Sequence, residues 1–333
     1  MRRHAMSTWV GSGRTSRTLL LGALAGGLLI TSLVVAPPPA GKVYRVGFLS
    51  SAGAEPFRAA MRELGYVEGQ NLVLEVRDAA GRLDQLPALA ADLVRARVDV
   101  IAAASPPAIQ AAKNATATIP IVMAFTSADP VKSGFVKSLA RPGGNITGVA
   151  MLADEIAGKR LEKLKEMLPE ATRFALLAQV DHSTTTGQVE AARKTAKSLA
   201  VELDVIEVRD SRDYEKAFAV AAKSASGLFV VANPTFSQDR HLLAELAAKH
   251  RLATICEWHE MAVAGCLMAY GPNFFDLQRR VARYVDQIVR GARPADLPVE
   301  QPTTFELTIN VDTAKTLGLT VPQSLLSNAR VVP

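Results

Sequence analysis

The chain has 333 residues, 49% of them hydrophobic, and a formal net charge of +6. The length accommodates two domains of ordinary size, and the hydrophobic content suffices for a buried core. Arg2, Arg3, Arg14 and Arg17 account for most of the net charge, and no acid accompanies them in residues 1–40. The remainder is nearly neutral and carries no basic stripe, which argues against a nucleic-acid partner.

Residues 1–40 have the pattern of a targeting segment. Arginines precede an apolar run over residues 19–36, and Val34 and Ala36 occupy the −3 and −1 positions before Pro37. We interpret this as a signal peptide that is cleaved on export, which predicts a periplasmic protein. The alternative is an uncleaved N-terminal anchor, because 18 apolar residues are near the minimum that spans a bilayer.

The two cysteines are Cys256 and Cys266, so no cysteine follows the apolar run to carry a lipid. If the protein is exported, the two cysteines can form a disulfide, because such bonds persist in oxidising compartments. Two thiols ten residues apart are more commonly small buried side chains, and this is our expectation here.

From residue 43 onward, strand and helix patterns alternate. Phe57, Ala60, Met61 and Leu64 form the apolar stripe of a helix that Gly65 ends. A second helical stripe covers residues 86–94, and further helices are expected from about residue 107 and over 130–140. The strands expected in this half are 44–50, 72–77, 98–105 and 119–126.

The alternation resumes after residue 149. Leu161, Leu164 and Leu168 line one face of a helix. Strands are expected at 173–180, 201–208 and 227–233, with helical segments between them. The C-terminal part adds a strand at 266–271, a helix at 274–291, a strand at 305–310 and a short helix near 313–317.

Strands separated by helices predict parallel pairing, and therefore doubly wound α/β sheets. The stretch "SLARPGGNITGV" (138–149) interrupts this pattern with a proline, two glycines and an asparagine. We interpret it as a crossing between two Rossmann-like lobes, with Gly143, Gly144 and Asn145 in a hinge. The alternative is an ordinary surface turn within one large sheet.

Motifs of catalysis are missing from the sequence. There is no P-loop, no G-x-G-x-x-G after the first strand and no G-x-S-x-G elbow. "HEMAV" starts at His259 like a zinc-protease helix, but Val263 stands where the second histidine would be. We therefore expect neither an enzyme nor a metal or other cofactor.

Polar residues at the ends of the expected strands are the candidate ligand-binding residues. Ligands of doubly wound sheets bind beyond the carboxyl ends of the strands, where helix N-termini attract anions. Hydroxyl groups there suit a carboxylate, and Asp or Glu suits an ammonium group. The alternative for each is a helix cap. The candidates are Ser50, Ser51, Ser105, Thr126, Ser127, Asp129, Asp181, Asn233 and Glu257, with Phe125, Trp258 and Tyr270 as apolar walls or core residues.

Three long blocks resemble one family. Residues 64–94 ("LGYVEGQNLVLEVRDAAGRLDQLPALAADLV"), 119–149 ("IPIVMAFTSADPVKSGFVKSLARPGGNITGV") and 296–326 ("DLPVEQPTTFELTINVDTAKTLGLTVPQSLL") closely resemble ABC-transporter substrate-binding proteins of the group that includes tryptophan- and tyrosine-linked uptake components. The resemblance implies a type I periplasmic binding fold, in which three crossings join two α/β lobes around the ligand.

The resemblance also implies domain boundaries. The crossings fall near 143–147, near 271–273 with Gly271 as a hinge residue, and within 297–304. Lobe 1 then comprises residues 43–146 plus 272–298, and lobe 2 comprises 147–271 plus 299–333. The chain departs from the family in lacking a lipid-bearing cysteine and in having Gly265-Cys266 where relatives usually have Gly-Gly.

The function implied is that of an extracytoplasmic receptor for an ABC importer. It would bind a small molecule, an amino acid or small carboxylate, between its lobes by hinge closure. The partners implied are the ligand and a membrane permease, and we expect a monomer. The alternative is a ligand-sensing module of a regulator or signalling receptor, although a repressor would begin with a basic helix-turn-helix.

Overall fold

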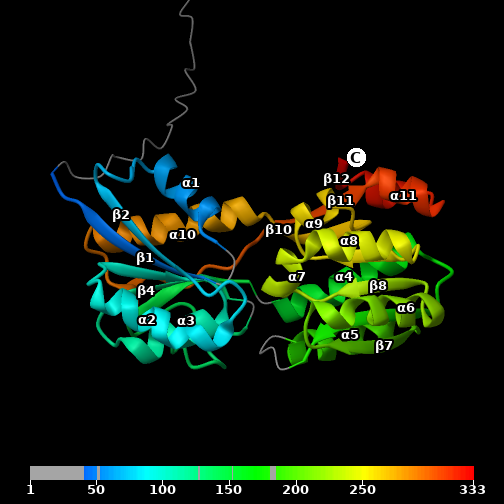
Figure 1. The fold of residues 1–333 in the computed structure, drawn as a ribbon, viewed down its shortest axis with the longest axis horizontal. Coiled ribbons are helices and arrows are strands. Elements are labelled where there is room, and N and C mark those ends of the chain that lie inside the picture. The colour runs from blue at the N-terminus through cyan, green and yellow to red at the C-terminus, as the bar shows by residue number, and fades with distance from the viewer. Residues whose placement is uncertain (1–40, 51–52, 127, 152, 181–184) are drawn as a thin grey trace, which may run out of the picture. The chain divides into compact units, whose positions relative to one another are not determined.

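Figure 1 presents the computed structural model of the chain, which describes residues 41–50, 53–126, 128–151, 153–180 and 185–333. The predicted signal peptide or anchor, residues 1–40, lies outside the described residues, as do Ser51, Ser127 and Asp181. Among the described helices, none has the length and apolar character that a membrane span requires.

The first lobe is built on a sheet of five parallel strands in the order β2-β1-β3-β4-β5. Successive side chains of a strand point to opposite faces, and the core divides accordingly. Val100 and Ala102 of β3 belong to one buried cluster, and Ile101 and Ala103 to another. The strands are β1 (Tyr44–Ser50), β2 (Leu72–Asp78), β3 (Val100–Ala103), β4 (Ile121–Thr126) and β5 (Ile146–Ala150).

Helices cover both faces of this sheet, as Figure 1 shows. On one face, α1 packs against α10, which the chain supplies from far along the sequence. On the other face, α2 packs against α3. The four helices are α1 (Glu55–Glu63), α2 (Leu86–Arg95, preceded by the 3₁₀ helix η1 at Leu83–Gln85), α3 (Pro106–Ala115) and α10 (Phe274–Val289).

The second lobe has a seven-stranded sheet in the order β12-β11-β10-β9-β8-β6-β7. Its strands pair in parallel except β10 with β11, which are antiparallel. The strands are β6 (Arg173–Gln179), β7 (Glu202–Val208), β8 (Gly227–Val230), β9 (Ala253–Cys256), β10 (Met268–Pro272), β11 (Phe305–Asn310) and β12 (Ala329–Val332).

In the second lobe α4 packs against α5, and α6 contacts α8. The remaining helices described in this lobe have seven residues or fewer. The helices are α4 (Ala153–Met167), α5 (Thr185–Ser198), α6 (Tyr214–Ser224), α7 (Pro234–Gln238), α8 (Arg240–Lys249), α9 (His259–Val263), α11 (Val311–Leu317) and α12 (Gln323–Leu326), with 3₁₀ helices η2 (Ser211–Asp213) and η3 (Pro294–Asp296).

The predicted fold class, two α/β lobes with parallel sheets, is confirmed, but individual elements differ. The helix expected over 130–140 is wrong: the segment forms turns. Gly134 has a φ of +66°, in the left-handed region, and the amides of Phe135 and Val136 donate back to the carbonyl of Pro130. This closes a single turn that does not propagate. Strands β5, β9 and β12 are real elements that the sequence analysis did not anticipate.

The first predicted crossing also lies elsewhere. Strand β5 pairs with β4 in the first sheet, so the chain leaves that sheet after Ala150 and not at residues 143–147. Gly143 and Asn145 precede β5, at the opposite end of the strand from the crossing. The Asn145 side chain donates to the carbonyls of Thr116 and Ile119, which fixes it to the first lobe. Gly143, Gly144 and Asn145 therefore lie before β5, on the first-lobe side of the crossing, and their role as a hinge stays a prediction.

The other two crossings lie near the predicted positions. Strand β10 ends at Pro272, directly after Gly271, and Asn273 then caps α10 of the first lobe. The Asn273 amide also donates to Glu306 of β11. On the last crossing, the Glu300 amide donates to the Gly148 carbonyl, and the Ala150 amide donates to the Glu300 carbonyl. Residues 299–300 thus belong with the first sheet, so the boundary predicted after residue 298 lies slightly too early.

Candidate ligand-binding site

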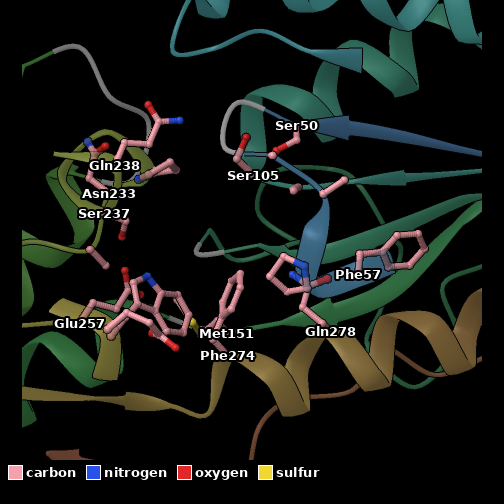
Figure 2. Close-up of a pocket in the computed structure, with 18 of the residues that line it drawn as sticks. Ser50, Phe57, Ser105, Met151, Asn233, Ser237, Gln238, Glu257, Phe274 and Gln278 are labelled. Carbon is pink, nitrogen blue, oxygen red and sulfur yellow. The ribbon is translucent and has the colours of Figure 1, made fainter. Parts of the chain in front are cut away.

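A cavity of about 280 Å³ lies where strands of both sheets end (Figure 2). This is close to the lower end of the volumes typical of small-molecule sites. Residues from both lobes line it: Phe48, Ser50, Gly53, Ala54, Pro56, Phe57, Ala104, Ser105, Pro106, Met151, Ala232, Asn233, Pro234, Ser237, Gln238, Arg240, Glu257, Trp258, Glu260, Met261, Phe274, Phe275 and Gln278.

Parallel pairing explains why these residues meet. Ser50 ends β1, and Ser105 follows β3, so both stand at the carboxyl edge of the first sheet. Asn233 and Glu257 follow β8 and β9 at the carboxyl edge of the second sheet. Figure 2 shows Ser50 and Ser105 on one side of the cavity and Glu257 across it. This is the place where open α/β sheets bind ligands.

Aromatic and sulfur-containing side chains form most of the apolar wall. The Trp258 ring meets the Phe274 ring edge to face, with centroids 5.2 Å apart. Trp258 belongs to the second lobe and Phe274 to α10 of the first, so this contact joins the two lobes beside the cavity. Phe48 and Phe57 stack with centroids 4.9 Å apart. Met151 and Met261 complete an apolar wall that accommodates a large side chain.

Ser105 combines backbone strain with an unsatisfied hydroxyl group. Its φ of +97° and ψ of +151° lie in a region that residues other than glycine seldom adopt. The residue is 5% exposed, and among the described residues its Oγ has no hydrogen-bond partner. Both features cost free energy of folding, and neither is needed to begin α3. A strained residue that aims an unpaired hydroxyl into a cavity is a candidate for contact with a ligand.

The start of α3 restricts the hydrogen bonds available there. Pro106 and Pro107 occupy its first two positions and have no N–H group. The Ile109 amide already donates to the Ser105 carbonyl. The helix N-terminus therefore offers an anion fewer backbone donors than usual, and the Ser105 hydroxyl becomes correspondingly more important.

Glu257 forms a buried ion pair with Arg160 of α4. The two side chains are 4% and 0% exposed, and an Arg160 terminal nitrogen lies 3.5 Å from Glu257 Oε1, at the limit of hydrogen-bond distance. The Arg160 Nε donates to the carbonyl of Tyr270 at 2.8 Å. Within the described residues, Glu257 Oε1 and both terminal nitrogens of Arg160 lack hydrogen-bond partners.

Burial dominates the electrostatics of this pair. It raises the pKa of the Glu257 carboxyl to about 7, although the positive charge of Arg160 acts in the opposite direction. Burial likewise lowers the pKa of the Arg160 guanidinium. Removing charges from water costs more than one long contact returns. The Glu257 carboxyl group therefore stands beside the cavity with room for another positively charged or hydrogen-bonding partner.

Five of the predicted ligand-binding residues line the cavity: Ser50, Ser105, Asn233, Glu257 and Trp258. Asn233 also has a structural role, because its carbonyl oxygen accepts from the Thr235 amide and its amide group donates to Gln179. It thereby caps α7.

Other predicted residues are not among those that line the cavity. The Thr126 hydroxyl bonds to the backbone of Ala128, and Asp129 accepts from the amides of Val131 and Lys132. Both side chains therefore bond to nearby backbone in turns, and among the described residues before β5 no helix follows for them to cap. Tyr270 stacks on Phe305. Phe125 belongs to β4, but its side chain is outside what is described, as are Ser51, Ser127 and Asp181 altogether.

The sequence analysis missed the contributions of α4, α7 and α10. Gln278 of α10 is 2% exposed, and its Oε1 has no hydrogen-bond partner among the described residues. It sits within the apolar stripe of Leu277, Val281 and Tyr284, and a polar residue in such a stripe is the signal that identifies it. No comparable signal marks Arg160, because charged residues surround it in the sequence.

A disulfide joins Cys256 and Cys266, whose Cα atoms are 6.6 Å apart. The expectation of two unlinked buried thiols is therefore wrong, although both residues are buried. The bond spans the segment that carries Glu257 and Trp258. No group of three or more His, Cys, Asp and Glu residues suited to a metal ion occurs in the described part of the chain.

Two α/β lobes that enclose a mainly apolar cavity with a few inward polar groups define a solute-binding protein. The family model described as "ABC transporter substrate binding protein" matches residues 51–332. The chain belongs to this family of extracytoplasmic solute-binding proteins and is a non-enzymatic, solute-binding component of an ABC transporter.

Similar proteins agree with this assignment. A "Tyrosine-binding protein" from Clostridioides difficile (strain R20291) is 26% identical over 264 residues, which are 79% of this chain and 75% of that protein. A solved ABC domain in complex with L-Trp from Streptococcus pneumonia has a TM-score of 0.80 at 22% identity, covering 88% of this chain and all of that one. A conserved domain protein from Vibrio cholerae has a TM-score of 0.81 at 24% identity, with the same coverage. These structures confirm the periplasmic binding protein fold.

The raised pKa of Glu257 predicts a pH-dependent effect of Glu257→Gln on stability. Between the ordinary value of 4.5 and about 7, the folded chain holds a proton that the unfolded chain has released. The free energy of unfolding of the parent therefore falls as pH rises through this window, by on the order of 3 kcal/mol. The variant lacks this loss, so its stability relative to the parent is greatest above pH 7 and the advantage vanishes near pH 4.5.

Urea unfolding of both proteins at pH 5 and pH 8 measures this difference. Glu260→Gln is the matched control, since Glu260 lies nearby on α9 and is only half-buried. Equal pH dependence in the parent and in Glu257→Gln would contradict the buried, proton-holding carboxyl group.

Proposed function

We propose that the cavity binds an α-amino acid with a large apolar, preferably aromatic, side chain for uptake by the transporter. The observation that carries this proposal is the pair of unsatisfied polar atoms at the cavity: Ser105 Oγ from the first lobe and Glu257 Oε1 from the second. An amino acid has a carboxylate and an ammonium group on one carbon atom, and these two groups suit a hydroxyl and a carboxylate respectively.

The carboxylate of the ligand is assigned to the first lobe. The Ser105 hydroxyl donates to it, and the N-terminal end of α3 adds a favourable dipole. Ser50, at the end of β1, stands beside Ser105 in Figure 2 and adds a second hydroxyl group. Because two prolines remove backbone donors from α3, this subsite suits a single carboxylate better than a phosphate group, which needs more donors.

The ammonium group of the ligand is assigned to Glu257. A positive charge within hydrogen-bond distance favours the ionised carboxylate and supplies the partner that Arg160 at 3.5 Å provides only weakly. Binding therefore releases the proton that burial retains on Glu257 in the empty protein near neutral pH. A ligand without an ammonium group leaves the carboxyl group in its unfavourable surroundings.

The side chain of the ligand is assigned to the apolar wall. Trp258 and Phe274 present aromatic edges and faces, and Met151 and Met261 adapt to the shape of a ring. The names of two similar proteins, one that binds tyrosine and one solved with L-Trp, support an aromatic ligand. The cavity of about 280 Å³ also suits one amino acid better than a peptide.

Closure of the lobes follows because each lobe contributes different contacts to the ligand. A ligand held by Ser105 on one lobe gains the contacts of Glu257 and Trp258 only when the other lobe approaches, and this difference in affinity favours the closed arrangement. The closed protein, as a monomer, is then the form that a membrane permease recognises. Export to the periplasm agrees with the disulfide, since such bonds persist in oxidising compartments.

Isothermal titration of the full chain with L-tryptophan, L-tyrosine and L-phenylalanine tests the ligand class. We expect at least one of them to bind. For L-tryptophan, the matched controls are tryptamine, which lacks the carboxylate, and 3-indolepropionate, which lacks the ammonium group. Each analogue should bind at least about tenfold more weakly, because one charged hydrogen-bonded group is lost. Equal affinity for 3-indolepropionate would overturn the role of Glu257, and no binding of any amino acid would overturn the ligand class.

Two substitutions of Ser105 separate its strain from its hydroxyl group. Ser105→Ala and Ser105→Gly both remove the hydroxyl and should weaken amino-acid binding about tenfold. Glycine adopts a φ of +97° without the strain that a side chain causes, so Ser105→Gly should be about 1 kcal/mol more stable than Ser105→Ala. Calorimetric titration and thermal unfolding measure the two effects. Unchanged affinity in both variants would remove Ser105 from the site.

A further inference from the structure

The segment of residues 257–265, here called the binding loop, connects β9 to β10 and contains α9. Four of its residues line the cavity: Glu257, Trp258, Glu260 and Met261. The Cys256–Cys266 disulfide joins the residues on either side of the loop. No other short segment of the described chain brings together a candidate charged group, an aromatic wall and a covalent bond at its base.

Non-covalent contacts hold the binding loop from His259 onward. Asn310 donates to the carbonyl of Ala262 at 2.9 Å, and Thr313 donates to the carbonyl of Gly265 at 3.2 Å. His259 lies within hydrogen-bond distance, 3.1 Å, of Thr308. These three contacts tie residues 259, 262 and 265 of the loop to β11 and α11.

The two loop residues nearest β9 contact different lobes. The Glu257 carboxyl group lies 3.5 Å from a terminal nitrogen of Arg160, and the Trp258 ring meets the Phe274 ring of the other lobe edge to face. A contact across the lobes loosens when they separate. Strands β9 and β10 pair over only two residues in register, Ile255 with Met268 and Cys256 with Ala269. The disulfide therefore fixes the end of the loop at which Glu257 and Trp258 emerge.

We propose that the Cys256–Cys266 disulfide is a positioning element of the ligand site, which holds Glu257 and Trp258 in their binding arrangement before the ligand arrives. The proposal rests on the proposed function, in which these two residues contact the ligand. Immobilising a side chain on binding costs affinity, and a loop fixed in advance avoids that cost. The disulfide acts through its neighbours, since neither cysteine is among the residues that line the cavity.

The test replaces both cysteines, Cys256→Ala with Cys266→Ala, in a full chain that also carries Trp9→Phe. The sequence has two tryptophans, Trp9 and Trp258, so Trp258 alone then reports by fluorescence. We expect the double variant to bind L-tyrosine at least about tenfold more weakly than the Trp9→Phe parent in calorimetric titration, well below the melting temperature. We also expect Trp258 emission to shift to longer wavelength and acrylamide to quench it more strongly.

Leu325→Ala is the matched control for a general loss of stability. Leu325 is fully buried on α12 and is not among the cavity residues. Its removal should lower the melting temperature but leave L-tyrosine affinity and Trp258 emission unchanged. Should the double variant fail to fold, the parent reduced with TCEP gives the same two measurements without a substitution.

The outcomes separate this proposal from the proposed function. If the parent binds L-tyrosine, the affinity of the double variant tests the proposal. A dissociation constant within twofold of that of the parent overturns the positioning role. If the parent binds no amino acid, the proposed ligand class fails, and Trp258 emission decides alone. Emission and quenching equal to those of the parent would then overturn the proposal, because the loop would hold its arrangement without the bond.

Discussion

Parallel pairing of strands is the constraint on which the site depends. In a parallel sheet all carboxyl ends stand at one edge, and in each lobe the chain continues from that edge into residues of the cavity. Ser50 and Ser105 come from the first sheet, and Asn233 and Glu257 from the second. No two of these residues are neighbours in the sequence. The sheet therefore assembles the site, and the helices that follow the strands orient its polar groups.

Several residues at this edge of the sheets destabilise the folded protein. Ser105 has a strained backbone and an unpaired hydroxyl, while Glu257 and Arg160 are buried with polar atoms unsatisfied. The apolar cores of both lobes must offset these costs, since nothing in the local sequence compensates for them. A ligand with a carboxylate and an ammonium group satisfies the hydroxyl of Ser105 and the carboxylate of Glu257 together. In the proposed function, one ligand therefore satisfies polar groups of both lobes.

Sequence periodicity predicted most of the fold because apolar stripes and strand ends are local features. Ser105 could be named in advance because an expected strand ends there, whereas Glu257 was named although its strand, β9, was not anticipated. The same rule also named Thr126 and Asp129, whose polar groups instead bond to nearby backbone, and local sequence does not distinguish these outcomes. Whether Arg160 and Phe274 reach the site depends on which face of α4 and of α10 packs toward it, and this is set by the tertiary structure. The expected helix over 130–140 failed because Gly134 adopts a left-handed conformation that the apolar pattern does not reveal.

The central claim is that one amino acid bridges Ser105 and Glu257 between the two lobes. A crystal structure of the complex with the aromatic amino acid that binds most tightly tests it most directly. The account predicts the ligand carboxylate within hydrogen-bond distance of Ser105 Oγ, its ammonium group at Glu257, and its ring against Trp258. A ligand bound elsewhere, or one bound in this cavity with its ammonium group away from Glu257, would contradict the account.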